Sequence, residues 1–300
     1  MTAPARILLQ TTIPTTDDDW SIARFSRLAA LLGGLRDDAG KPLFEIVARD
    51  RAVTAADGAD PVLATLDESD FAALWLFAVD VGDGLSADEC AAISQFRRRG
   101  GGLVVTRDHM DLGSSVCTLG GVGAAHFFHT RNPEPDESRR VDDDPFTTDI
   151  HWPNYHSGAN GDAQEVTPVG ELHPVLRDPA AAGGPLRYLP SHPHEGAVGA
   201  PPDDPTARVI AVGRSQATGR AFNIAVAFEP SEAGGPAIAE STFHHFADYN
   251  WSPADGAPSF VAEPPGRGLA DMPEAQRQIR QYAVNVACWT TGLAPPAVSV

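Results

Sequence analysis

The chain has 300 residues, 42% of them hydrophobic, which is enough to bury the core of one large domain or two small ones. Its 22 Lys and Arg against 40 Asp and Glu give a formal net charge of −18, so it lacks the cationic surface that binds nucleic acids and anionic membranes. The three cysteines lie far apart without a CxxC pair, which excludes a disulfide framework and a cysteine-built zinc site.

The first half of the chain predicts alternating buried strands and amphipathic helices. Short apolar runs indicate strands at 6–12, 44–48, 73–79 and 103–106, and helices are expected at 20–32 and 86–99. Asp17–Asp19 precede the first helix, where its dipole favours negative charge, and Ser86 with Glu89 matches a capping box at the second. This alternation is typical of a parallel sheet covered by helices on both faces.

The second half is less regular and contains many Gly and Pro residues. Further strands are predicted at 209–213, 221–228 and 237–243, and a closing helix runs from Asp271 to Trp289. Long surface loops are expected near 131–160 and 251–270. Because no linker or internal repeat divides the chain, we expect residues 1–300 to form a single domain.

Polar residues crowd the end of the strand predicted at 103–106. Ligands of open parallel sheets bind outside the carboxyl ends of the strands, where Arg107, Asp108, His109 and Asp111 lie. A carboxylate beside an imidazole fixes its tautomer and raises its basicity. We therefore predict that His109 is an acid or base assisted by Asp108 or Asp111, and that Arg107 holds an anionic or hydroxyl-rich group. The alternative is that His109 only anchors the loop through hydrogen bonds.

The other candidate groups are mostly clustered histidines. His192 and His194 lie two residues apart in PSHPHEG, so both can reach one metal ion if the segment is extended. His244 and His245 are adjacent, and at the end of a strand only one of them faces a pocket, where it is a catalytic candidate. Polar and aromatic residues nearby or in the 151–160 loop are candidates for substrate binding: Trp152, His156, Glu240, Asp248 and Tyr249.

Several segments, in order, resemble the ThuA-like (trehalose-utilisation) branch of the class I glutamine amidotransferase-like superfamily. A glycine triplet and strand lead to a histidine at Gly100–His109, and LGGVGAAHFFH at 119–129 resembles the family's glycine-rich helix. The remaining matches are HPV at 173–175, GGPAIAESTFHH at 234–245 and NVACWTTG at 285–292. The segment before His109 is one residue longer than the usual pattern, and the 131–156 stretch has no counterpart.

The resemblance implies a flavodoxin-like three-layer α/β sandwich with a mostly parallel sheet and an elaborated C-terminal half. The wider superfamily often carries a nucleophilic cysteine on the turn after this strand, but this chain has none there. The nearest, Cys117, lies well downstream in a glycine-rich stretch. Glutamine amidotransferase activity is therefore not expected.

Three functions remain open. The first is an enzyme that hydrolyses or isomerises a polar, carbohydrate-derived small molecule by acid–base chemistry. The second is a metal-dependent hydrolase whose histidines hold a divalent metal, and the third is a non-catalytic binding protein that retains the fold. The N-terminal MTAPARILLQTT has no signal-peptide pattern, so we expect a soluble, cytoplasmic protein. The expected partner is a small molecule, and neither nucleic acid nor a membrane is expected as a partner. A homo-oligomer is possible.

Overall fold

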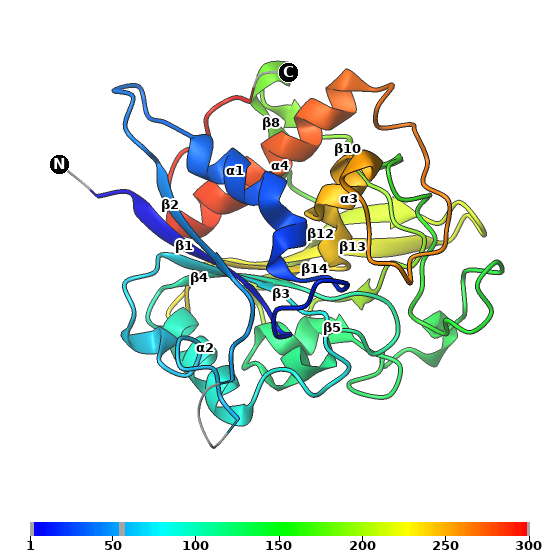
Figure 1. The fold of residues 1–300 in the computed structure, drawn as a ribbon, viewed down its shortest axis with the longest axis horizontal. Helices are drawn as coiled ribbons and strands as arrows, with labels where there is room; N and C mark the ends of the chain where they lie inside the picture. The colour runs from blue at the N-terminus through cyan, green and yellow to red at the C-terminus, as the bar shows by residue number, and fades with distance from the viewer. Residues whose placement is uncertain (1–2, 54–57, 299–300) are drawn as a thin grey trace.

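The computed structural model describes residues 3–53 and 58–298. Its centre is an eight-stranded sheet in the order β2-β1-β3-β4-β14-β13-β12-β7 (Figure 1). The strands are β1 (Ala5–Thr11), β2 (Phe44–Arg49), β3 (Ala73–Phe77), β4 (Gly102–Thr106), β7 (Thr167–Pro168), β12 (Ala207–Arg214), β13 (Ala221–Phe228) and β14 (Ala237–Glu240). The five strands from β2 to β14 are parallel, and β13, β12 and β7 extend the sheet antiparallel.

Helices cover both faces of this sheet. The helices α1 (Ser26–Gly34) and α4 (Pro273–Thr291) lie on one face and α2 (Ala87–Arg98) lies on the other, as Figure 1 shows. Side chains of β3 point alternately to the two faces of the sheet. Trp75 packs in the hydrophobic core that includes residues of α1 and α4, whereas Leu74 and Leu76 pack in the core that includes residues of α2. The predicted three-layer α/β sandwich with a mostly parallel sheet is confirmed.

The capping box predicted at the second helix is present. The Ser86 hydroxyl accepts a hydrogen bond from the Glu89 backbone N–H, and the Glu89 side chain accepts one from the Ser86 N–H. The strands predicted at 6–12, 44–48 and 103–106 match β1, β2 and β4 to within one residue at each end. Local pattern was sufficient here because each element is a short apolar run, buried throughout in β4 and in most of β1, and partly exposed in the edge strand β2.

Two predicted elements are wrong in their bounds, both next to the candidate site. The helix expected at 20–32 is a 3-10 turn, η1 (Ile22–Phe25), followed by α1, whose first N–H groups, at Ser26 and Arg27, donate to the Asp248 carboxylate. The strand expected at 237–243 ends at Glu240. After it, the Thr242 hydroxyl accepts from the His244 N–H and starts a 3-10 turn, η8 (Phe243–His245).

The segment that resembles the family's glycine-rich helix is also not an α-helix. It contains the 3-10 turn η4 (Val122–Ala125) and follows another, η3 (Ser114–Thr118), because its glycines favour turns over a continuous helix. The other short elements are β5 (His126–Phe127), β6 (Ala163–Glu165), β8 (Arg177–Asp178), β9 (Gly184–Pro185), β10 (Tyr188–Pro190), β11 (Ala197–Val198) and α3 (Asp248–Trp251). Among the described residues, no helix combines the length and apolar character needed to span a bilayer.

Candidate functional site

A cavity of about 180 Å³ opens at the carboxyl ends of the parallel strands. It is lined by residues that follow four of those strands, among them Trp20 after β1, Val79 after β3, Asp108 after β4 and His244 after β14. The loop before β11 adds His192 and His194. The cavity therefore gathers side chains from segments far apart in the sequence.

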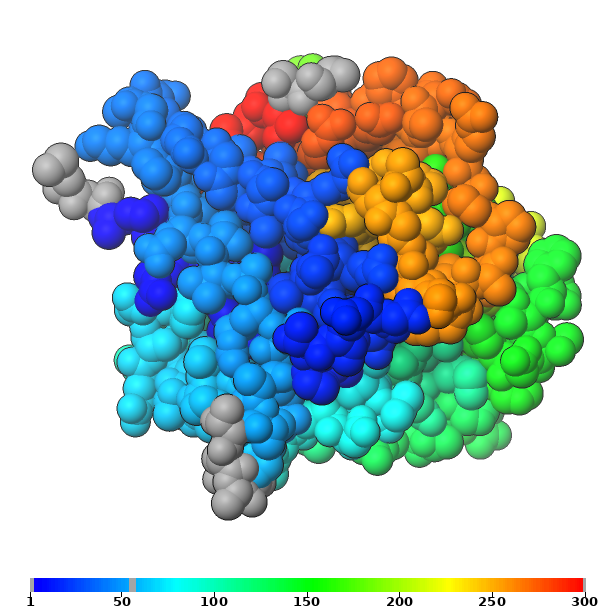
Figure 2. All heavy atoms as spheres, in the orientation of Figure 1, coloured from blue at the N-terminus to red at the C-terminus, as the bar shows by residue number. Residues whose placement is uncertain are grey.

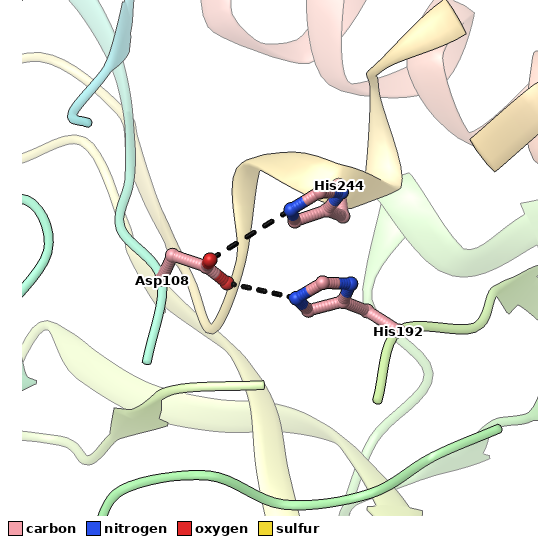
Figure 3. Close-up of side chains that lie close together, drawn as sticks. All are labelled: Asp108, His192 and His244. Atoms are coloured by element: carbon pink, nitrogen blue, oxygen red, sulfur yellow. Dashed lines mark ion pairs between the residues drawn. The ribbon is translucent and has the colours of Figure 1, made fainter. Parts of the chain in front are cut away.

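Asp108, His192 and His244 converge in this cavity (Figure 3). The His192 Nε2 lies 3.4 Å from one carboxylate oxygen of Asp108, and the His244 Nε2 lies 3.7 Å from the other. The two imidazole rings stack with centroids 3.5 Å apart and an interplanar angle of 10°. One potential ligand atom from each of the three residues lies within 4.8 Å of the other two, which is compatible with a single metal ion after small adjustments.

Two asparagines fix the tautomers of these histidines. The Asn250 amide donates to the Ser191 carbonyl, which can only accept, and to the Asn160 Oδ1. The amide oxygens therefore face the histidines, and the Nδ1 atoms of His192 and His244 must donate to them, over 2.9 and 2.7 Å. Both Nε2 lone pairs consequently point toward Asp108. Second-shell partners of metal-bound histidines hold the ring in the same way.

Electrostatics keep both imidazoles neutral. Burial lowers the pKa of His192 and of His244 well below the ordinary value, and the neighbouring histidines lower each further. Within the described part of the chain, the His192 Nε2 has no hydrogen-bond partner although its side chain is only 6% exposed. A buried acceptor without a donor raises the free energy of the folded state. A cavity that contains such an acceptor is therefore suited to a ligand that can bind to it.

His109 and His194 form another wall of the cavity. The His109 Nε2 lies 3.8 Å from the Asp108 carboxylate. Its side chain is 21% exposed, which is more than the 6% of His192 and the 2% of His244, the other two imidazoles near Asp108. Burial lowers the pKa of His109, while the charge of Asp108 opposes this effect. The His194 Nε2 lies 3.1 Å from Glu263, and its Nδ1 lies 3.4 Å from Asp144. His109 can therefore exchange protons with a molecule in the cavity.

His245 does not line the cavity and belongs to a closed ionic cluster. Its Nδ1 lies 3.0 Å from Glu240 and its Nε2 lies 3.5 Å from Glu195, and Tyr282 donates to Glu240. Burial by itself lowers the pKa of His245, but the charge of Glu195 and hydrogen bonds to both carboxylates outweigh it and raise the pKa to about 9. We assign His245 the imidazolium form, paired between Glu195 and Glu240.

The remaining predicted site residues also lie outside the cavity lining. The Arg107 guanidinium is fully buried, donates to the carbonyls of Phe127 and Met110, and packs over the Phe128 ring. Burial lowers its pKa to about 9, although Asp108 and Asp111 oppose the shift. Asp111 accepts hydrogen bonds from Thr130.

Asp248 caps α1, as described above, and the aromatic candidates are engaged elsewhere. The backbone N–H of Trp152 donates to Asp142, and the His156 ring lies 5.8 Å from the Phe146 ring. Trp152 and Tyr249 are buried. Sequence reasoning missed Asn250 and included Asn160 only as one member of the polar 151–160 loop, because a single asparagine in a loop carries no pattern that distinguishes it from a turn residue.

Solved structures with a similar fold are found at low sequence identity. A scan against protein-family models and a search of curated proteins give no match. A solved structure from Parabacteroides merdae, described as ThuA-like, is 13% identical, with 99% of this chain and 93% of that chain covered and a TM-score of 0.50. A second from Bacteroides uniformis, also described as ThuA-like, is 12% identical, with 93% of both chains covered and a TM-score of 0.46.

The glutaminase domain of Trypanosoma brucei CTPS is 15% identical, with 90% of this chain and 93% of that domain covered and a TM-score of 0.43. The likeness to the Parabacteroides merdae protein shows that this chain has the fold of a structure described as ThuA-like, as the resemblance in sequence implied. At this identity the likeness concerns the fold alone. The chemistry of the site has to be argued from its own residues.

Proposed function

We propose that this protein is a metal-dependent hydrolase of a small polar molecule, with the ion held by Asp108, His192 and His244. The observation that carries the proposal is the convergence of two tautomer-fixed, neutral imidazole nitrogens and one carboxylate in an open cavity. Three protein ligands with a remaining open position are the arrangement of catalytic zinc sites. A bound divalent ion supplies Lewis acidity and lowers the pKa of water there.

The residues around this centre fit hydrolysis of an ester or amide. A water oxygen adds to the carbonyl carbon and the water gives up a proton, the C–O or C–N bond to the leaving group breaks, and the leaving group takes up that proton. His109 lies beside Asp108 at the open side of the cavity and is the group that transfers this proton. A nucleophilic cysteine is not needed for this reaction, in keeping with its absence after β4.

Metal content tests the proposal directly. Untagged protein is dialysed with Zn²⁺, washed and analysed for metal, alongside Asp108→Asn, His192→Ala and His244→Ala. We expect about one equivalent in the parent protein and a loss of at least about tenfold in affinity in each variant. His129→Ala is the matched control, because His129 is exposed and outside the cavity lining. Less than about a tenth of an equivalent in the parent protein contradicts the proposal.

Activity separates the roles of the histidines. With p-nitrophenyl acetate as the probe, chelation should abolish hydrolysis and Zn²⁺ should restore it. His109→Ala should retain the metal but lose about 100-fold or more in turnover, because general acid–base catalysis contributes that much. If hydrolysis is independent of metal but still requires His109 and Asp108, the simpler acid–base enzyme predicted from the sequence replaces this proposal.

A further inference from the structure

The charged side chains that line the cavity are acidic. Three carboxylates line it, those of Asp19, Asp108 and Glu263, and Asp144 lies behind His194. Among the described residues that form the lining, none is Lys or Arg. The nearest guanidinium in the sequence, that of Arg107, is directed to backbone carbonyls instead. The carboxylates are therefore the lining's only side chains that carry a full charge of fixed sign among the described residues, and one of the three, Asp108, belongs to the proposed metal site.

Part of the cavity lining comes from two segments that meet at the surface. The segments near residues 13–20 and 253–263, dark blue and orange in Figure 2, pack side by side on one face of the molecule. The Ser259 N–H donates to Asp18 over 2.6 Å and joins them. They bring Asp19 and Trp20 from one segment, and Phe260 and Glu263 from the other, into the lining of the same cavity.

This combination of groups is specific for a cation. Carboxylates attract it directly, and the faces of Trp20 and Phe260 can attract it through their quadrupoles. Phe260 is 60% exposed, so its ring is available at the opening. An anionic group placed at the same side meets Asp19 and Glu263, and the described lining holds no Lys or Arg that could offset these carboxylates; Glu263 contacts the His194 imidazole, over 3.1 Å. In the same cavity, the buried His192 Nε2 has no hydrogen-bond partner among the described residues, so the cavity has a polar atom that a ligand can satisfy.

We infer that the substrate carries an ammonium group, which lies between Asp19 and Glu263 while its hydrolysable end faces Asp108, His192 and His244. This inference rests on the proposed function and names its substrate class. It replaces the expectation from the sequence that Arg107 binds an anionic group. It also agrees with the small volume of the cavity, which suits a short amine better than an oligomeric molecule.

Three hydroxamates that differ only in the charge of their distal end test the inference on the zinc-loaded protein: β-alanine hydroxamate with an ammonium, butyrohydroxamate with a methyl group, and succinic monohydroxamate with a carboxylate. Dissociation constants are measured by calorimetry. We expect the ammonium compound to bind about tenfold more tightly than the neutral one, and the carboxylate compound to bind most weakly.

The variants Glu263→Gln and Asp19→Asn should each reduce the preference for the ammonium compound by about threefold and leave the neutral compound unaffected. Glu232→Gln is the matched control, since Glu232 is an exposed acid outside the cavity lining. Equal affinities, a preference for the carboxylate compound, or no binding by a protein that holds zinc overturns the inference and leaves the metal site intact. A protein that holds no zinc overturns the proposed function and this inference with it.

Discussion

His244 and His245 are neighbours in the sequence, yet they occupy opposite environments. His244 lines a cavity, donates its Nδ1–H to a neutral amide and has a pKa well below the ordinary value. His245 is enclosed, lies between Glu195 and Glu240, and has a pKa raised to about 9. The η8 turn directs one ring toward the carboxyl ends of the strands and the other toward the core with α4. The charge state of an imidazole is therefore set by its partners, not by its position in a motif.

The two rings therefore have different roles. The carboxylates beside His245 are permanent protein partners, so its charge is satisfied without a ligand. His244 and His192 each have an Nε2 lone pair directed toward Asp108. Among the described residues, no donor forms a hydrogen bond with the Nε2 of His192. We accordingly expect substitutions around His245 to affect folding, and substitutions around His244 to affect ligand binding.

The largest expected effect is on folding. His245→Ala leaves the buried carboxylates of Glu195 and Glu240 without their cation, which should reduce the free energy of unfolding by about 3–5 kcal/mol. His244→Ala removes a neutral ring and one hydrogen bond and should cost less than about 2 kcal/mol. Urea denaturation of both variants in metal-free buffer measures the difference. An equal loss of stability in the two variants would break the contrast between the rings.

A third buried histidine tests whether a lowered pKa alone marks a site. Burial, together with the charge of Arg208, lowers the pKa of His173 to about 3, but His173 lies outside the cavity lining. Its folded pKa is below the unfolded value of about 6.5, so the unfolded chain binds the proton first as the pH falls. Stability from this group is present above about pH 6.5 and is lost toward pH 3.

Between pH 7 and pH 5, His173 should account for a loss of about 2 kcal/mol in the free energy of unfolding. His173→Gln should remove that part of the pH dependence, and the exposed His129→Gln should not. Denaturation curves for the three proteins at both pH values provide the measurement. Identical slopes with pH in the parent and His173→Gln would show that His173 binds as many protons in the folded as in the unfolded chain, and would contradict a lowered pKa.

The asparagine network should affect metal affinity more than folding. Asn250→Ala frees the Nδ1 of His244 and removes a bond to Asn160, so His244 can adopt the wrong tautomer. Loss of such a second-shell partner should weaken Zn²⁺ binding by about tenfold. Asn223→Ala is the control, because Asn223 donates to Val198 away from the cavity lining. Competition with a coloured chelator measures both affinities, and an unchanged affinity in Asn250→Ala would contradict the tautomer assignment.

The smallest effect is expected at Asp111, which the sequence placed beside His109 as a catalytic candidate. Its carboxylate accepts from the Thr130 backbone and hydroxyl and does not line the cavity. Asp111→Asn should change the free energy of unfolding by less than about 1 kcal/mol and leave Zn²⁺ affinity and turnover unchanged. A turnover reduced as strongly as in His109→Ala would restore Asp111 to the catalytic group.

The sequence by itself determined the layered sheet and the edge at which the cavity lies. An apolar run as short as 73–77 favours a strand buried on both faces, and the carboxyl ends of parallel strands share one edge. For the same reason Asp108 and His109, which directly follow β4, could be placed at that edge from local pattern alone.

Only the tertiary structure decided which histidines meet, because the separations between Asp108, His192 and His244 in the chain exceed any local periodicity. It also reassigned Asp248 to the start of α1 and Arg107 to backbone carbonyls. Burial and the partners supplied by distant segments set the charge of each ring, and these are properties of packing. Residue types along one segment cannot encode them, as the opposite environments of His244 and His245 demonstrate.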